Sequence, residues 1–138
     1  MIPEDAVTQY LITHGWPDAE ATMVGIRGTG RVLWRCPGSA TAERSGDGLI
    51  GDWLDEVQDA ADLAGAALGV LVTPREDYGP ARVASWWAHL DVQALARVVA
   101  AGMDVPDVVQ EAPVRMHLST AVVLLRSAGL GAPLVVGQ

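Results

Sequence analysis

A helix pattern that runs directly into an apolar strand constrains the fold of this chain more than any other feature. Leu54, Val57 and Ala61 lie three or four residues apart and form one apolar stripe, which predicts a helix from about Leu49 to Gly65. The next residues, 67-ALGVLVT-73, form a short apolar run that is typical of a buried strand. This pairing predicts an α/β or α+β domain in which helices flank a small mixed β-sheet.

Strands and helices alternate along the rest of the chain. Two β-rich runs on either side of a Gly-Thr-Gly turn predict a hairpin over 21–36. Further helices are expected over 3–14, from Asp91 to near Gly102, and from a cap at Ser119 or Thr120 to Gly129. Further strands are expected over 83–90 and 114–118, with connections over 37–48, 74–82 and 103–113.

The length and composition are those of one packed domain. The chain has 138 residues and half of them are hydrophobic, so we expect a single domain over 1–138 with one modest core. No apolar run is long enough for a membrane helix, and the N-terminus has no signal-peptide pattern, so no membrane partner is expected. Cys36 is the only cysteine, which excludes an intramolecular disulfide and predicts a reducing, cytoplasmic location.

The charge of the chain limits its partners. The formal net charge is −8, and all nine cationic side chains are arginines because the chain has no lysine. Affinity for nucleic acid depends on basic surface that neutralises phosphates, so binding over the whole protein surface is not expected. A local basic patch remains compatible with this composition.

The stretch 46-GDGLIGDWLDEVQ-58 admits two interpretations, a metal site and a helix. In the first, Asp47 precedes a strand that carries Glu56 and Gln58, as in a metal-dependent nuclease. In the second, carboxylates at helical spacing form an acidic face, which consists of Asp52, Asp55, Glu56, Asp59 and Asp62. The helical spacing fits about twice as many positions as strand alternation does. The helix is therefore preferred, and Asp47 and Glu56 are not expected to converge on a metal.

A longer segment, 53-WLDEVQDAADLAGAALGVLVTPR-75, resembles the Holliday-junction-resolvase-like proteins of actinobacteria and their phages, members of the PD-(D/E)xK nuclease superfamily. The segments 79-GPARVASWWAHL-90 and 113-PVRMHLSTAVVLLRSAGLGAPL-134 are similar to the extended C-terminal version of these proteins. The resemblance implies a restriction-endonuclease-like core over 3–90, a C-terminal strand–helix extension over 103–138, and a homodimer.

The catalytic segment departs from this family. Family members place a Gly-Asp and then a strand with Glu-x-Lys upstream of the Trp-Leu-Asp-Glu helix, where the acids bind Mg²⁺ and the lysine helps to activate water. In this chain the hairpin over 21–36 has no Asp or Glu, and Leu33, Trp34 and Arg35 stand at the triplet. We therefore expect no catalytic residues, no metal and no cofactor. Mg²⁺ is expected only if its ligands have migrated to the 46–58 stretch.

A pair of tryptophans with two arginines is the preferred binding surface. Trp86 and Trp87 are expected to point to opposite faces of a strand, with Arg75 and Arg82 flanking the turn before it. Aromatic and arginine side chains are typical of protein–protein hot spots and of sites that stack unpaired bases. An ordinary division into core and rim side chains is the alternative interpretation.

A second basic surface is expected on the hairpin. Arg27, Arg31 and Arg35 are spaced four apart, which predicts one common face and a small patch for an anion or nucleic acid. Ordinary solvated strand positions are the alternative. Cys36 follows Arg35, and its thiol is expected either to have a lowered pKa or to be inert and half-buried at the end of a strand.

These observations predict a catalytically inactive nuclease-like protein that binds a protein partner or branched or unpaired DNA. A second hypothesis is a phage-encoded inhibitor, in the host cytoplasm, that docks to a partner protein through its acidic face. A third is an active Mg²⁺-dependent DNA nuclease that uses Asp47 and Glu56.

Overall fold

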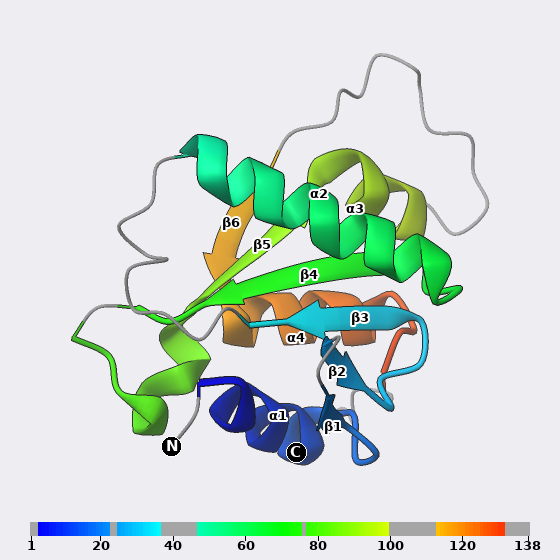
Figure 1. Cartoon of the computed structure of the whole chain (residues 1–138). Helices are drawn as coiled ribbons and strands as arrows, with labels where there is room; N and C mark the ends of the chain where they lie inside the picture. The colour runs from blue at the N-terminus through cyan, green and yellow to red at the C-terminus, as the bar shows by residue number, and fades with distance from the viewer. Residues whose placement is uncertain (1–2, 23–24, 37–46, 76, 100–112, 132–138) are drawn as a thin grey trace.

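Six strands form one mixed sheet in the computed structural model, which describes residues 3–22, 25–36, 47–75, 77–99 and 113–131. Their order in the sheet is their order along the chain, β1–β2–β3–β4–β5–β6 (Figure 1). The bounds are β1 Glu20–Thr22, β2 Gly25–Arg27, β3 Val32–Arg35, β4 Leu68–Thr73, β5 Trp87–Asp91 and β6 Pro113–His117. The β3 and β4 strands are parallel, and every other neighbouring pair is antiparallel.

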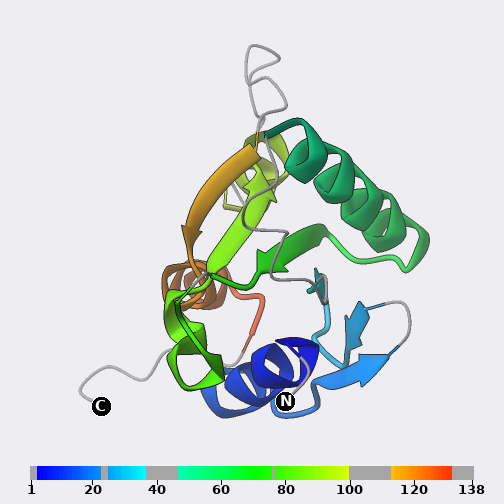
Figure 2. The same cartoon turned by 60° about the vertical axis from the view of Figure 1, so that its left-hand side comes forward.

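Helices cover both faces of this sheet (Figures 1 and 2). The helices α1, Pro3–His14, and α4, Leu118–Ser127, lie on one face, whereas α2, Asp47–Leu63, lies on the other. A 3-10 helix, η2, spans Pro80–Ser85 before β5, and α3, Val92–Val99, follows β5. The predicted mixed sheet with flanking helices is therefore confirmed. None of the described helices is both long and apolar enough to cross a membrane.

The side chains of β4 divide between two apolar cores. Val70 and Val72 belong to the larger core, together with side chains of α1 and α4. Leu71 belongs to the smaller core, where it packs with Leu54 and Val57 of α2. Because successive strand residues point to opposite faces and both faces are covered, every residue of β4 is buried. The apolar run in the sequence predicts this strand correctly.

Gly69 sets the distance between α2 and β4. A Cβ atom at this position would lie 2.8 Å from the Val57 side chain and 2.8 Å from the Val57 carbonyl oxygen. The Gly69 backbone N–H donates a hydrogen bond of 3.2 Å to the Gln58 side-chain oxygen, and the Gln58 amide nitrogen donates one of 3.1 Å to Asp62. One residue of the strand therefore meets the helix through both an apolar contact and a hydrogen bond.

The predicted hairpin is confirmed, and it contains one strand more than expected. The β2 and β3 strands pair with Ile26 opposite Trp34, and the turn between them holds Gly28 and Gly30 at φ values of 76° and 65°. Upstream, β1 pairs back onto β2, with Thr22 opposite Gly25. The first β-rich run of the sequence thus supplies two strands.

The predicted strand over 83–90 is wrong in its first half, which belongs to η2. The indole N–H of Trp86 donates a hydrogen bond of 2.8 Å to the Tyr78 carbonyl oxygen, and the Trp86 backbone N–H donates one of 3.0 Å to the Val83 carbonyl oxygen. The backbone bond closes a 3-10 turn around residues whose types favour a strand, and the indole bond holds this turn against the preceding loop, so β5 begins only at Trp87.

Of the two predicted helix caps, one is confirmed and the other is wrong. Asp91 caps α3 as predicted, because its side-chain oxygen accepts a hydrogen bond of 3.1 Å from the Ala94 backbone N–H. The predicted cap of the last helix at Ser119 or Thr120 is wrong, since α4 begins at Leu118. The Leu118 backbone N–H donates to the Trp86 carbonyl oxygen at 2.8 Å, so tertiary structure satisfies this helix end. The predicted connections over 37–46 and 103–112 and the helix end near Gly102 lie outside the described residues.

Replacement of Gly69 by alanine should lower the free energy of unfolding by about 1–3 kcal/mol, because the new methyl group must push α2 away from β4. Gly51→Ala is the matched control. A Cβ atom there has no neighbour within 4 Å, and alanine in a helix is more favourable than glycine by up to about 1 kcal/mol. Urea unfolding of both variants measures the difference. A Gly69→Ala variant as stable as the wild type would contradict the close approach.

Candidate functional site

Three arginines and two aromatic rings form a stack at the end of the sheet where β4 ends and β5 begins. This arginine–aromatic ladder consists, in order, of Arg82, Tyr78, Arg75, Trp87 and Arg115. The guanidinium carbons of Arg82 and Arg75 lie 4.2 Å and 4.1 Å from the Tyr78 ring centroid. Those of Arg75 and Arg115 lie 4.4 Å and 4.2 Å from the Trp87 ring centroid. Cations at these distances are attracted to the negative faces of the rings.

The register of three strands assembles the ladder. Trp87 pairs with Thr73 of β4 on one side and with His117 of β6 on the other. Arg75 follows Thr73 by two residues and Arg115 precedes His117 by two, so both arginines approach the Trp87 ring from neighbouring strands. The His117 ring adds a further contact, with its centroid 5.2 Å from that of Trp87.

The two tryptophans separate as the sequence predicts. Trp86 is 2% exposed and belongs to the larger core, while Trp87 is partly exposed and carries the ladder. The hydrogen bond from the Trp86 indole N–H to the Tyr78 carbonyl oxygen also fixes the turn that holds Tyr78. The buried tryptophan therefore positions one ring of the ladder, and its neighbour supplies the other.

The ladder leaves guanidinium donors accessible. Arg82 and Arg115 are exposed and Arg75 is partly exposed, with one donor directed at the Ser85 carbonyl oxygen at 3.4 Å. No ion pair involves these three arginines within the part of the chain that the structure describes. A guanidinium held on its flat face by a ring keeps its N–H edge free, and this edge matches a phosphate or carboxylate. The ladder can therefore bind an anion without first breaking an ion pair among these residues.

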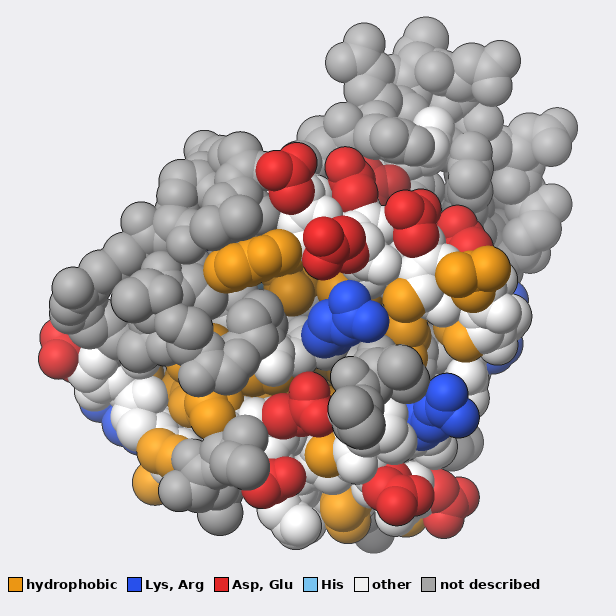
Figure 3. Space-filling view, in the orientation of Figure 1, with side chains coloured by type: hydrophobic (Ala, Val, Ile, Leu, Met, Phe, Trp, Pro, Cys, Tyr) orange, Lys and Arg blue, Asp and Glu red, His pale blue; other side chains and the backbone are white. Residues whose placement is uncertain are grey.

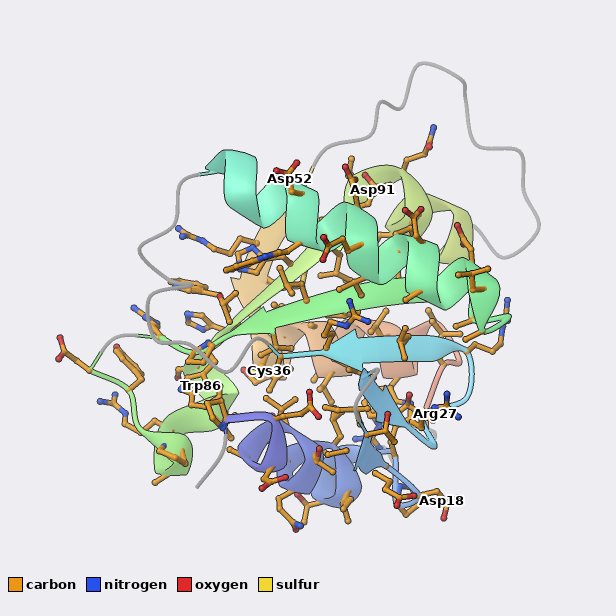
Figure 4. All side chains as sticks on the ribbon, in the orientation of Figure 1. Asp18, Arg27, Cys36, Asp52, Trp86 and Asp91 are labelled. Atoms are coloured by element: carbon orange, nitrogen blue, oxygen red, sulfur yellow. The ribbon has the colours of Figure 1, made fainter. Side chains whose placement is uncertain are left out.

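The structure brings together two of the three hairpin arginines. Arg27 and Arg35 line one hollow of about 530 Å³ between the hairpin and the end of α2. Arg31 is exposed and is not among the residues that line this hollow. Arg27 lies at the opposite end of the sheet from Trp86 (Figure 4), and no residue of the ladder is among those that line this hollow.

The acidic face of α2 is exposed along the helix. All five of its carboxylate side chains are exposed, and Asp and Glu side chains gather along the helix in Figure 3. Asp52 points away from the sheet (Figure 4). The helical interpretation of the 46–58 stretch is therefore confirmed, since α2 begins at Asp47 and continues to Leu63.

The residues proposed for a migrated metal site do not converge. Asp47 and Glu56 are nine residues apart in one continuous helix, which separates them by about 13 Å along its axis. At the position of the family's triplet, Leu33 and Trp34 are buried apolar side chains. Within the described residues, no group of three His, Cys, Asp or Glu side chains is placed to hold a metal. These residues do not fit the Mg²⁺ that the resemblance to active nucleases implies.

Glu4 belongs to a charged cluster that sequence reasoning missed. Glu4 of α1, Arg35 of β3 and Glu56 of α2 line one cavity of about 280 Å³. Partial burial and the nearby Asp5 raise the pKa of Glu4, although Arg35 and a hydrogen bond from the Cys36 backbone N–H act in the opposite direction. The guanidinium in this cavity opposes the binding of a divalent cation. No local pattern links Glu4 to Arg35, because they come together only in the folded sheet.

The hypothesis of a lowered thiol pKa at Cys36 is wrong. Cys36 is buried, and this burial together with the charge of Glu4 raises its pKa to about 12. Burial is the larger of these two causes. The thiol is neutral at physiological pH and cannot act as a nucleophile.

Cys36 should consequently resist labelling in the native protein. We expect a thiol reagent such as dithionitrobenzoate to react slowly at about pH 8 and to react with one equivalent of thiol once guanidinium chloride unfolds the chain. The absorbance of the released thionitrobenzoate measures both rates. Equal rates in the native and unfolded protein would show that the thiol is accessible in the fold.

No family model, curated protein or solved structure matches the chain. Its function must therefore be inferred from the side chains themselves. Among the surfaces described above, only the ladder combines unpaired arginines, aromatic rings and a fixed geometry.

Proposed function

We propose that this protein binds unpaired nucleic acid at the arginine–aromatic ladder and does not cleave it. The single observation that carries this proposal is the alternation of three guanidiniums with two rings, Tyr78 and Trp87. Guanidinium edges bind phosphates, and aromatic rings and guanidinium planes stack on bases that are not paired. A duplex offers its phosphates but keeps its bases stacked inside, so the ladder favours a single strand.

The net charge of −8 limits the binding to this patch. An acidic surface elsewhere repels a polyanion, so we expect contacts with few phosphates and a correspondingly shallow dependence on salt. The ring contacts also hold the guanidiniums in place before the ligand arrives. Such preorganisation lowers the entropy that is lost on binding.

The resemblance to resolvase-like proteins supports this choice of ligand. Their order of hairpin, Trp-Leu-Asp-Glu helix and buried strand corresponds to β2–β3, α2 and β4 in this chain. The departure at Leu33, Trp34 and Arg35 supports binding without cleavage, because no carboxylate there can hold Mg²⁺. On this proposal the chain keeps a nuclease-like frame and uses it only for binding.

Fluorescence anisotropy with a labelled single-stranded oligonucleotide tests the ladder. For three phosphate contacts, the logarithm of the association constant should fall with the logarithm of salt concentration with a slope of about −2. The double variant Arg82→Gln/Arg115→Gln should reduce this slope by about 1.4 and weaken binding. Arg31→Gln is the matched control, since Arg31 is exposed and lies outside the ladder.

Three outcomes would overturn the proposal. Unchanged binding in the Arg82/Arg115 double variant would remove the ladder from the site. Tighter binding to a duplex than to a single strand would remove the role of the rings. Salt-independent binding would show that phosphates are not the recognised groups.

Incubation with branched DNA in Mg²⁺ or Mn²⁺ should give no cleavage above the background of a buffer control. The physical reason is that Asp47 and Glu56 lie on one helix about 13 Å apart and cannot share a metal ion. Denaturing gel electrophoresis of the DNA measures the product. Metal-dependent cleavage that disappears in Glu56→Ala would establish the active-nuclease hypothesis instead.

The acidic face supports a second candidate function. Five exposed carboxylates on one helix could take the place of the phosphates of a DNA backbone. An inhibitor could use them to dock a basic protein partner. We propose this reading only for the case in which the oligonucleotide does not bind. Titration with a synthetic oligoarginine peptide, against an Asp52→Asn/Asp59→Asn variant, would then distinguish a specific docking face from general attraction by net charge.

A further inference from the structure

The α2 helix has a second apolar flank that does not face the sheet core. Leu54, Val57 and Ala61 form the buried stripe, but Ala60, and Ala64 just after the helix, lie on the side that faces the hairpin. Trp53 continues this flank one turn before Glu56 and is only partly buried. Leu63, at the end of the helix, is 91% exposed, the highest value among the large apolar side chains that the structure describes. Leu63 is therefore available as an apolar contact next to the hollow that it lines.

A groove runs between this flank and the hairpin. The hollow of about 530 Å³ has Leu33, Ala60 and Leu63 among its lining residues, and the cavity of about 280 Å³ has Trp53 and Glu56. Both cavities have Arg35 among their lining residues, so they adjoin at this side chain beside the β2–β3 hairpin. We call the two cavities together the α2 groove. In Figure 3, apolar side chains and an arginine lie in this region, directly beside the acidic face of α2.

The dimensions of the α2 groove match a short helix. Trp53 and Leu63 are ten residues apart on α2, which gives a length of about 15 Å, or nearly three helical turns. On this face of the sheet, α2 packs on β4 and also contacts β3, and no helix among the described ranges lies over β2 (Figures 1 and 2). A helix laid beside α2 would complete the layer and would bury Leu63.

Charge determines the orientation of such a helix. Arg27 and the Gly28–Gly30 turn line one end of the groove, and Glu4 and Glu56 line the other. The N-terminus of a helix carries partial positive charge and its C-terminal end is stabilised by nearby cations. The complementary occupant therefore places its N-terminus near Glu4 and Glu56, and carries acidic side chains in its last turn opposite Arg27.

We propose that the α2 groove docks an amphipathic helix of a partner protein, with an apolar stripe and a C-terminal acidic turn. This interaction goes beyond the proposed binding of nucleic acid, because the groove and the ladder are separate surfaces. Leu63 supplies the exposed apolar anchor, Leu33 and Ala60 line the groove, and Arg27 selects the acidic end. The partner would be held by helix-in-groove packing, with specificity from the charge at each end.

A pair of synthetic peptides tests this proposal on the full chain. Both are labelled three-turn helices with leucines at positions i, i+3, i+4 and i+7, and they differ only in two glutamates or two lysines in the last turn. We expect the glutamate peptide to bind in an anisotropy titration and the lysine peptide to bind at least tenfold more weakly. Arg27→Glu should reverse this preference.

Leu63→Gln should weaken binding of the glutamate peptide about tenfold, because it removes the apolar side chain that the docked peptide would bury and adds no charge. Val123→Gln is the matched control, since Val123 is 51% exposed on α4 and lies outside the groove. Circular dichroism and urea unfolding of both variants check that the fold is intact.

Several outcomes would overturn the proposal. Equal binding of the two peptides would remove the charge selection, and binding insensitive to Leu63→Gln would place the peptide elsewhere. Sedimentation that shows a dimer of the free chain, lost in Leu63→Gln, would assign the groove to a second copy instead. The ladder variant that tests oligonucleotide binding does not alter the α2 groove, so it should bind both peptides as the wild type does. The proposal on peptide binding can therefore fail while the proposal on nucleic-acid binding holds, and the reverse.

Discussion

The close contact between α2 and β4 at Gly69 is the constraint on which the other surfaces depend. Gly69 brings Val57 against the strand backbone, and Gln58 joins the two elements by a hydrogen bond. This contact fixes the rotation of α2 about its own axis. With Leu54 and Val57 turned inward, the acidic face must point to solvent, and Ala60 must face the hairpin. One glycine therefore determines which sides of the helix are available to partners.

The ladder depends on a different constraint, the position of β5 between β4 and β6. Antiparallel pairing on both sides puts Trp87 beside residues from two other segments of the chain. The 3-10 helix η2 delays the start of β5, and the Trp86 indole holds the carbonyl of Tyr78. Both rings are thus fixed by buried structure, while the arginines that stack on them remain accessible. A strongly acidic chain can present positive charge in this way because the patch is local and rigid.

The β3 strand contributes to packing and to one charged cluster. Trp34 is fully buried and Leu33 lines the α2 groove, where the resemblance would require metal ligands. Arg35 lies in a cavity with Glu4 and Glu56, two acids that come from different helices. The side of β3 that lines the groove is therefore apolar at Leu33 and charged at Arg35.

The sequence by itself was sufficient for α2, for β4 and for the separation of Trp86 from Trp87. Helical and strand periodicities are local, so a single segment shows which of its sides is apolar. The acidic face and the missing acids of the hairpin could also be read directly, because they depend only on residue type and spacing. The boundaries of η2 and α4 could not, since hydrogen bonds from Trp86 and Leu118 to distant backbone carbonyls decide them.

Only the tertiary structure decided which polar side chains meet. Arg115 reaches Trp87 through the register of β5 and β6, and Glu4 reaches Arg35 because α1 packs beside the end of β3. Neither pair has a signature in the sequence, because contacts between distant segments leave no periodicity in either one. The α2 groove has the same origin, since its two walls belong to elements that the chain joins through a separate segment. Spacing along the chain determines what each element is, and packing determines what the elements can bind together.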